Sequence, residues 1–262
     1  MKRLLSLCIM GVSLAVSGQK AALVKQLKSF VPKGFAIRDT AFGDLNNDTK
    51  TDVVLVVYTT KEDDENFEDT AMNIGRPLMV LLQQPDGKLK QAKRNDNMIM
   101  CKQCGGMMGD PFQGVTIKNN AFSLEFYGGS SWRWGDTYSF NWNAGKQTWQ
   151  LTKEKHESYQ SGDPESSLKE TNIPASEIQD LTIDNFNIDQ LGVSQEVKGK
   201  VVAPKCYFFN EPKLSTKRKA YVMQGDVINI VREFKTFYEA SFMNKKEQIT
   251  SGYVLKKDVQ RL

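Results

Sequence analysis

An oxygen-rich loop leads directly into an apolar strand in the stretch Asp44-Leu-Asn-Asn-Asp-Thr-Lys-Thr-Asp52-Val-Val-Leu-Val-Val57. The side chains of Asp44, Asn46, Asp48 and Asp52 supply oxygens at loop positions 1, 3, 5 and 9, and the backbone carbonyl of Lys50 can add one at position 7. Calcium prefers six to eight oxygen ligands at roughly 2.3–2.6 Å. The loop therefore predicts a structural calcium site, although Asp and Asn also form metal-free turns before a strand.

Periodicity on either side of this loop predicts a mainly antiparallel β fold, arranged as a meander or sandwich, with one N-terminal helix. Apolar residues have helical spacing over 21–30, and strands are predicted at 53–58 and 78–82. From residue 114 onward, apolar and polar side chains alternate with a period of two, most clearly over 122–126 and 138–142. One face of this second sheet carries many aromatic rings, which indicates core rather than a ligand platform.

A basic start followed by an apolar run indicates an export signal over residues 1–18. Met1-Lys2-Arg3 precedes the run from Leu4 to Val16, which is too short to span a bilayer as a helix. Cleavage is predicted near Gly18, because small residues lie before this position. We therefore expect a periplasmic or secreted protein without a transmembrane segment.

Composition divides the remaining chain into an antiparallel β domain (19–155), a polar linker (156–198) and a small β-barrel (199–262). The last segment holds 13 Lys and Arg against 6 Asp and Glu, a net charge of +7, whereas residues 19–198 hold 20 against 25, a net charge of −5. A basic module behind an acidic one indicates an anionic partner, or lysines that only keep a small domain soluble. No nucleic-acid binding is expected.

The sequence Cys101-Lys-Gln-Cys104 predicts a local disulfide, because exported proteins fold under oxidising conditions. A thioredoxin-like role would need a helix start after the first cysteine, and the glycine-rich sequence that follows is a poor one. Zinc would need two further ligands, for which only His156 and Cys206 remain. We expect Cys206 to be a buried thiol, and His156 to be a non-catalytic linker residue without an orienting partner.

The stretch Tyr127-Gly-Gly-Ser-Ser-Trp132-Arg-Trp134 places two indoles at positions i and i+2 of a strand, on one side of the sheet. An aromatic pair beside a polar loop can bind sugars or peptides, so Trp132 and Trp134 are candidate ligand contacts. The alternative is that both rings pack over the edge of the sheet. Arg133 faces the other way, with Asp110 or Asp136 as the expected partner.

The loop at Phe42-Gly43-Asp44 to Asp52, with its valine-rich strand, resembles a single FG-GAP/VCBS-type calcium element. This resemblance implies side-chain ligands at Asp44, Asn46, Asp48 and Asp52 and a carbonyl ligand at Lys50. Thr49 departs from the pattern, because a glycine usually permits the sharp turn at this position. Leu55 stands at position 12, where an EF-hand would have glutamate.

Residues 200–262 resemble a bacterial SH3-like domain, through an aromatic strand at 206–209, a Gly225-Asp226 turn before an apolar strand, and a late Gly252-Tyr-Val strand. The family often has Gly-Trp where this chain has Phe237-Tyr238 and Gly252-Tyr253. The resemblance implies binding of peptidoglycan stems, peptides or a partner domain. The candidate ligand contacts are Tyr207, Tyr221 and Tyr253.

The cysteine motif, Gly109-Asp-Pro-Phe112 and the double-tryptophan motif together also resemble a group of exported bacterial proteins, from which no activity carries over. We therefore expect a non-catalytic envelope protein that binds peptidoglycan or an envelope protein, with its first domain braced by calcium. One alternative is a secreted inhibitor or immunity-type protein. A hydrolase would have to use carboxylates of the first domain, namely Asp64, Glu65, Asp110 and Glu125.

Overall fold

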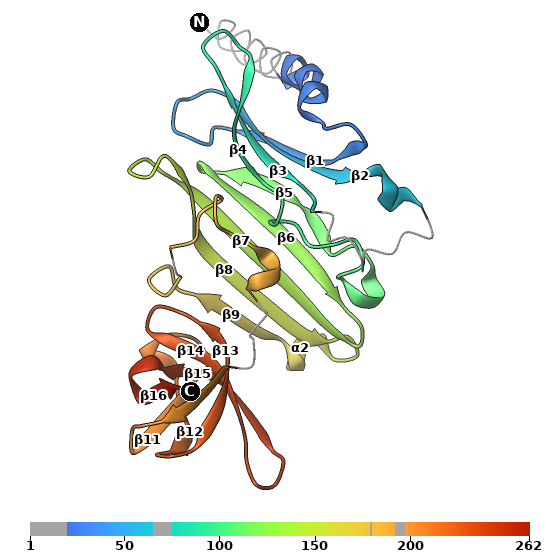
Figure 1. The fold of residues 1–262 in the computed structure, drawn as a ribbon. Helices are drawn as coiled ribbons and strands as arrows, with labels where there is room; N and C mark the ends of the chain where they lie inside the picture. The colour runs from blue at the N-terminus through green and yellow to red at the C-terminus, as the bar shows by residue number, and fades with distance from the viewer. Residues whose placement is uncertain (1–19, 65–74, 179, 192–196) are drawn as a thin grey trace, which may run out of the picture.

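The chain folds mainly into antiparallel β structure, with a short N-terminal helix and three sheets that follow one another along the sequence (Figure 1). The computed structural model describes residues 20–64, 75–178, 180–191 and 197–262. The predicted export signal therefore lies outside the described residues. None of the helices in the described part of the chain combines the length and the apolarity needed to cross a membrane.

The first sheet is built around a strand that is buried on both faces. Its order is β1 (Phe35–Gly43), β2 (Asp52–Thr59), β3 (Leu78–Gln83) and β4 (Leu89–Asn95). On one face, Val53 and Leu55 pack against Leu23 and Leu27 of the helix over residues 20–27. The residues between them, such as Val54, point into the core shared with the second sheet. Burial on both faces explains why β2 is apolar at every position from 53 to 57.

The second sheet is a five-stranded meander in sequence order. It comprises β5 (Phe112–Lys118), β6 (Ala121–Gly129), β7 (Trp132–Asn143), β8 (Thr148–Gln160) and β9 (Lys169–Ile173). The predicted aromatic layer is confirmed as core: Phe122 and Phe140 are fully buried and stack with ring centroids 5.0 Å apart. Asn119 and Asn120 form the β5–β6 turn with positive φ, as expected for this residue type.

The predicted linker over 156–198 is wrong for its first part. Residues 156–160 continue β8, α2 (Pro164–Ser167) follows, and β9 returns to pair with β8. Ile183, Phe186 and Ile188 are buried in the main core. This segment is polar in composition because it forms the margin of a sheet, and most of its apolar residues are buried, with Leu168 as an exposed exception.

The third sheet is a curled half-barrel of seven strands, drawn in orange and red in Figure 1. The strands are β10 (Val197–Val201), β11 (Lys205–Phe209), β12 (Lys217–Met223), β13 (Val227–Glu233), β14 (Phe237–Met243), β15 (Ile249–Leu255) and β16 (Val259–Arg261). Their order in the sheet is β12-β11-β15-β14-β13-β10-β16. Cys206 is a free, fully buried thiol in its core, as predicted.

The half-barrel packs against the rest of the chain through aromatic residues. Phe209, Phe234, Phe237 and Tyr253 belong to the same buried cluster as the second sheet.

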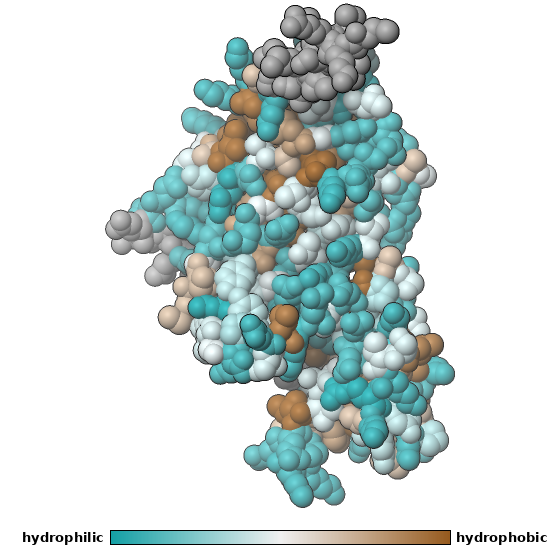
Figure 2. Space-filling view, turned by 180° about the vertical axis from the view of Figure 1, so that it is seen from behind, coloured by the Kyte–Doolittle hydropathy of each residue, from teal (hydrophilic) through white to brown (hydrophobic). Residues whose placement is uncertain are grey.

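Short 3₁₀ segments lie between the longer elements, at Lys28–Phe30, Thr60–Asp63, Gly106–Met108, Ile188–Gln190, Leu214–Thr216 and Lys256–Asp258. Outside these contacts, the face in Figure 2 is mostly hydrophilic, with hydrophobic side chains in scattered groups.

Candidate functional site

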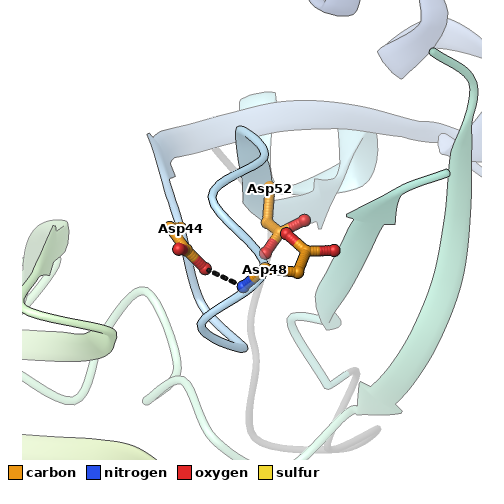
Figure 3. Close-up of side chains that lie close together, drawn as sticks. All are labelled: Asp44, Asp48 and Asp52. Atoms are coloured by element: carbon orange, nitrogen blue, oxygen red, sulfur yellow. Dashed lines mark hydrogen bonds between the residues drawn. The ribbon is translucent and has the colours of Figure 1, made fainter. Parts of the chain in front are cut away.

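The predicted calcium loop brings three carboxylates together. One ligand oxygen from each of Asp44, Asp48 and Asp52 lies within 4.8 Å of the others, so the three residues can hold a metal ion. Figure 3 shows these side chains in the loop between β1 and β2. Asp52 is fully buried at the start of β2, whereas Asp44 and Asp48 are half-buried.

Backbone amides of the same loop already bind these carboxylates. The Asp44 carboxylate accepts N–H bonds from residues 46–49, with Asn47 at 2.8 Å and Thr49 at 2.8 Å. Asp52 accepts from the amides of Leu45 and Gln83, both at 2.9 Å. The loop is thus a hydrogen-bonded turn that holds its acids in place, which is the metal-free arrangement that Asp and Asn favour.

Asn46 and Lys50, the two predicted ligands without a carboxylate, both interact with Asp48. The side-chain oxygen of Asn46 accepts the amide of Asp48 at 3.1 Å. The Lys50 ammonium lies 2.9 Å from Asp48 Oδ2, where it balances part of the negative charge. Thr49 has φ of 68°, which confirms that a β-branched residue occupies the left-handed position where glycine would be strain-free.

The three acids have unequal affinities for protons. Burial raises the pKa of Asp52 to about 6, and the nearby charges of Asp48 and Asp44 add to this, although the amides of Gln83 and Leu45 oppose it. Asp48 has a lowered pKa, because hydrogen bonds from Lys50 and Asn46 outweigh the effect of burial. A buried carboxylate that resists ionisation gains from any cation that neutralises it.

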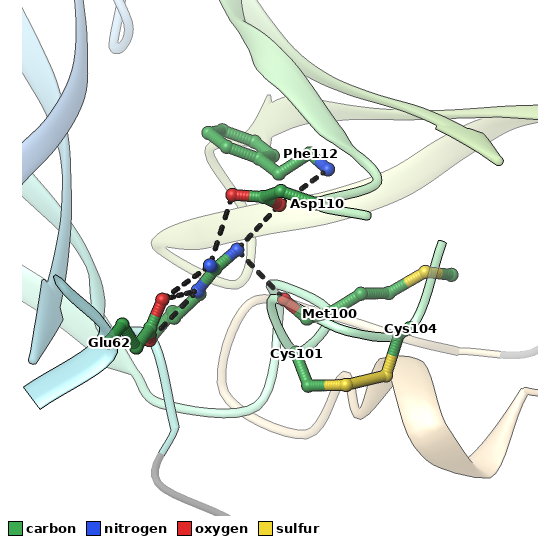
Figure 4. Close-up of a disulfide and its surroundings, with 7 residues drawn as sticks. Glu62, Met100, Cys101, Cys104, Asp110 and Phe112 are labelled. Carbon is green, nitrogen blue, oxygen red and sulfur yellow. Dashed lines mark hydrogen bonds and ion pairs between the residues drawn. A yellow bond between two sulfur atoms is a disulfide. The ribbon is translucent and has the colours of Figure 1, made fainter. Parts of the chain in front are cut away.

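The predicted disulfide between Cys101 and Cys104 is present, in a loop beside a buried ion cluster (Figure 4). Arg76, only 2% exposed, donates to Glu62, to both oxygens of Asp110 at 2.8 and 3.0 Å, and to the carbonyl of Met100. Every polar edge of the guanidinium is thus occupied. Because Glu62 follows β2 and Met100 precedes Cys101, this cluster connects the first sheet to the disulfide loop.

The same cluster uses one of the acids that a hydrolase would need. Asp110 is bound by Arg76 and also by Arg38 at 3.3 Å. Glu125 is exposed on β6, and Glu65 lies outside the described residues. Arg133 bonds the carbonyl of Gly129 at 3.2 Å, so the expected ion pair with Asp110 or Asp136 is wrong.

The five aromatic candidates lie in three separate places. On β7, Trp132 is 51% exposed, and Trp134 packs so closely on Gly128 that a Cβ there would lie 2.4 Å from the indole. Tyr207 and Tyr221 face each other across β11 and β12 with ring centroids 5.5 Å apart. Tyr253 is buried against Phe234, where the half-barrel meets the second sheet.

A further group of polar residues, missed by the sequence analysis, lies at this junction. Its members are Asp136 and Tyr138 on β7, Glu154 and His156 on β8, and Arg232 and Glu239 on the half-barrel. His156 donates through Nδ1 to Asp136 at 2.7 Å and through Nε2 to Glu154. The prediction of a linker histidine without an orienting partner is therefore wrong.

The Glu154 carboxylate is fully buried and shared between two cations. Besides His156, Arg232 donates to it from both terminal nitrogens, one of them at 2.9 Å. Burial opposes ionisation, but the bonds from His156 and Arg232 outweigh it and lower the pKa of Glu154 to about 2. Burial likewise opposes the imidazolium, and Asp136 with Glu154 reverses this effect and raises the pKa of His156 to about 9.

An irregularity in β8 explains why these residues point inward. The register between β7 and β8 shifts between Ser139 and Phe140, so Thr152 is an extra residue. Before it, Trp149 and Leu151 face the core; after it, Glu154 and His156 take the same face. A β-bulge of this kind reverses the alternation of a strand.

Comparison of the chain with protein-family models, curated proteins and solved structures found no match. The three resemblances based on the sequence therefore stay predictions.

Replacing Glu154 with Gln should destabilise the folded chain by about 3–5 kcal/mol, because it leaves the Arg232 cation buried without its counter-charge. The measurement is the free energy of unfolding in urea at pH 6. Glu157→Gln on the same strand is the control, since Glu157 is only half-buried and pairs with Lys155 rather than with a buried cation. Equal effects of the two variants would show that the Glu154 pair is unimportant.

Stability should also depend on pH at both ends of the range. Glu154 has a lowered pKa, so its contribution to stability is complete above pH 4.5 and is lost as the pH falls toward 2. His156 has a raised pKa, so its contribution is complete below pH 6.5 and is lost as the pH rises through 9. Urea midpoints should therefore be highest between these limits. In His156→Gln the decrease between pH 6.5 and 9 should disappear, and its persistence would contradict the assignment.

Proposed function

We propose that this chain is a non-catalytic, exported binding protein whose half-barrel contacts an anionic, peptide-bearing polymer of the cell envelope, with peptidoglycan as the leading candidate. The observation that carries this proposal is a lysine-flanked tyrosine pair on the half-barrel. An acidic envelope protein is the alternative partner, and the experiment below separates the two.

The tyrosine pair offers aromatic surface and positive charge together. Tyr221 is 45% exposed, and Lys205 Nζ lies 4.7 Å from its ring centroid. Lys217 Nζ lies 3.5 Å from the ring centroid of Tyr207. Ammonium groups held over ring faces keep their outward N–H groups for a carboxylate, while the rings supply apolar contact to the rest of the ligand.

The position of this pair suits an extended ligand. β12 is at one end of the seven-strand order, so its outer side has no neighbouring strand among the described residues. Residues 217–219 of this strand are Lys-Arg-Lys. An open strand edge can bind a peptide through its backbone, and the basic side chains favour an acidic one. The net charge of +7 over 199–262 strengthens this preference.

The curled sheet of short antiparallel strands also supports the proposed SH3-like character of this segment. Tyr253 has no place in the proposed ligand surface, because it is buried at the junction. Trp132 and Trp134 remain a second, separate aromatic surface, for which no ligand is proposed.

We also propose that the Asp44–Asp48–Asp52 group binds calcium in a structural role. Three carboxylates this close together suit a hard cation, and the cation would balance the negative charge of the buried Asp52. Trp149 of the second sheet donates to the carbonyl of Leu45 at 3.0 Å, so a rigid loop would brace the contact between two sheets.

Calcium should raise the thermal unfolding midpoint of the full chain, and EDTA should reverse this. At free calcium a hundred times Kd the expected stabilisation is about 2.7 kcal/mol. The effect should be absent in Asp48→Asn, which loses a ligand charge. Lys50→Ala should retain or strengthen it, because this variant keeps the backbone carbonyl and removes the competing ammonium.

Asp86→Asn in an exposed turn is the matched control for loss of one carboxylate and should respond like the unaltered chain. If calcium leaves the midpoint of the unaltered chain unchanged, the loop is a metal-free turn.

Isolated peptidoglycan should retain the full chain in a sedimentation assay. Retention should fall about tenfold, equivalent to ~1.4 kcal/mol, in the double variant Lys217→Ala/Tyr221→Ala. Lys246→Ala, in the turn between β14 and β15, is the control for charge loss elsewhere in the half-barrel. Because the contact is partly ionic, added salt should weaken retention.

A protein partner would be assigned by two results together. Peptidoglycan would fail to retain the chain, and an acidic envelope protein would retain the unaltered chain but not the double variant. Equal retention of the double variant and Lys246→Ala would remove the tyrosine pair from the proposal.

A further inference from the structure

A cavity of about 400 Å³ lies where the second sheet meets the half-barrel. Its lining includes the polar residues Asp136, His156, Thr171, Asp189, Arg232 and Glu239. Pockets for small molecules have volumes of roughly 300–1,000 Å³ and occur preferentially at such junctions. This cavity is separate from the tyrosine pair and from the aspartate loop.

The cations at this cavity are already used. Both ring nitrogens of His156 are bound to carboxylates, and both terminal nitrogens of Arg232 are bound to Glu154. Because Glu154 is fully buried, moving either cation away from it toward a ligand would leave a buried carboxylate with less counter-charge, which is unfavourable. Both positive charges are thus already balanced by carboxylates, so an anionic ligand would have to compete with Glu154 and Asp136 for them.

The carboxylates, by contrast, have acceptor capacity left. Glu239 accepts no hydrogen bond from the residues that the structure describes, and burial raises its pKa. A β-bulge at Val231 places Arg232 directly opposite Glu239, so the unsatisfied carboxylate faces the cavity beside a cation that is bound elsewhere. Asp136 uses one oxygen for His156. The group formed by Asp136, Glu154, Glu239, His156 and Arg232 carries a net charge of −1 when all five are ionised.

The cavity also has an apolar lining. Its aliphatic lining residues are Met100, Ile188, Leu191 and Val231, and Tyr253 adds an aromatic ring. These side chains suit a short hydrocarbon segment, which gains free energy when it leaves water. Carboxylate acceptors and aliphatic side chains in one cavity suit a ligand with a cationic end and an apolar body.

We propose that this cavity binds a primary ammonium group carried on a short aliphatic chain, with Glu239 as its ionic partner and the aliphatic lining residues as the seat of the chain. A metal ion is the poorer fit, because the described residues bring three acidic side chains within ligand distance of one another only at Asp44, Asp48 and Asp52. The amine supplies Glu239 with a hydrogen-bond donor that the described residues do not provide.

Titration calorimetry on the full chain at pH 7.5 tests this proposal, with pentylammonium chloride as the probe. Pentanol and sodium valerate have a similar hydrocarbon body without the positive charge. We expect saturable binding of pentylammonium, at least tenfold weaker binding of pentanol, and none of valerate. Glu239→Gln should weaken pentylammonium binding at least tenfold. Glu125→Gln, an exposed residue of β6, should leave binding unchanged.

Glutamine has nearly the same shape as glutamate, so Glu239→Gln should fold, and its melting curve verifies this. Val231→Phe provides a second test, because a larger side chain fills the cavity without changing its charge, and it should also reduce binding. Failure of pentylammonium to bind, equal binding by Glu239→Gln, or preference for valerate would each overturn the proposal. None of these results bears on peptidoglycan binding or on calcium.

Discussion

The buried carboxylate of Glu154 is the constraint on which the joining of the sheets depends. A charge removed from water costs several kcal/mol unless it is paired and hydrogen-bonded. The second sheet supplies one partner, His156, and the half-barrel supplies the other, Arg232. Since neither sheet satisfies the carboxylate alone, the half-barrel completes the structure of its neighbour.

The junction combines this ionic contact with an apolar one. Along β8 the inward face changes from Trp149 and Leu151 to Glu154 and His156, and the half-barrel presents Phe209 and Phe237 to the same core. Apolar contact supplies most of the free energy of docking, and the ion pair fixes its orientation. The cavity lies where these two kinds of contact meet, which explains its mixed lining.

Local pattern predicted much of the fold. Continuous apolar runs located β2 and β3, and alternation located β6 and β7. The Asn119-Asn120 turn was expected from its residue type, and the Cys101–Cys104 bridge from its spacing. The aspartate loop was found because its three acids lie within nine residues of one another.

The junction could not be predicted in the same way. The bulge at Thr152 interrupts the period of two, so Glu154 and His156 are out of phase with the core positions before them. Their stretch of sequence is polar and resembles a linker. Arg232 lies 78 positions after Glu154, and no local rule connects them. The repeated Lys-Glu-Lys-His-Glu pattern over 153–157 was the one available sign of a strand with charged faces.

The long separation between Glu154 and Arg232 has a consequence for biosynthesis. During synthesis from the N-terminus, Glu154 is made 78 residues before Arg232, its guanidinium partner. Until then β8 can pair with β7 and β9 but cannot enclose that acid, so the inward face of the second sheet stays uncovered at this point. Products that terminate before Arg232 would leave this face and its aromatic rings uncovered by the half-barrel. The segment that begins at Arg232 is therefore needed before the second sheet is closed around Glu154.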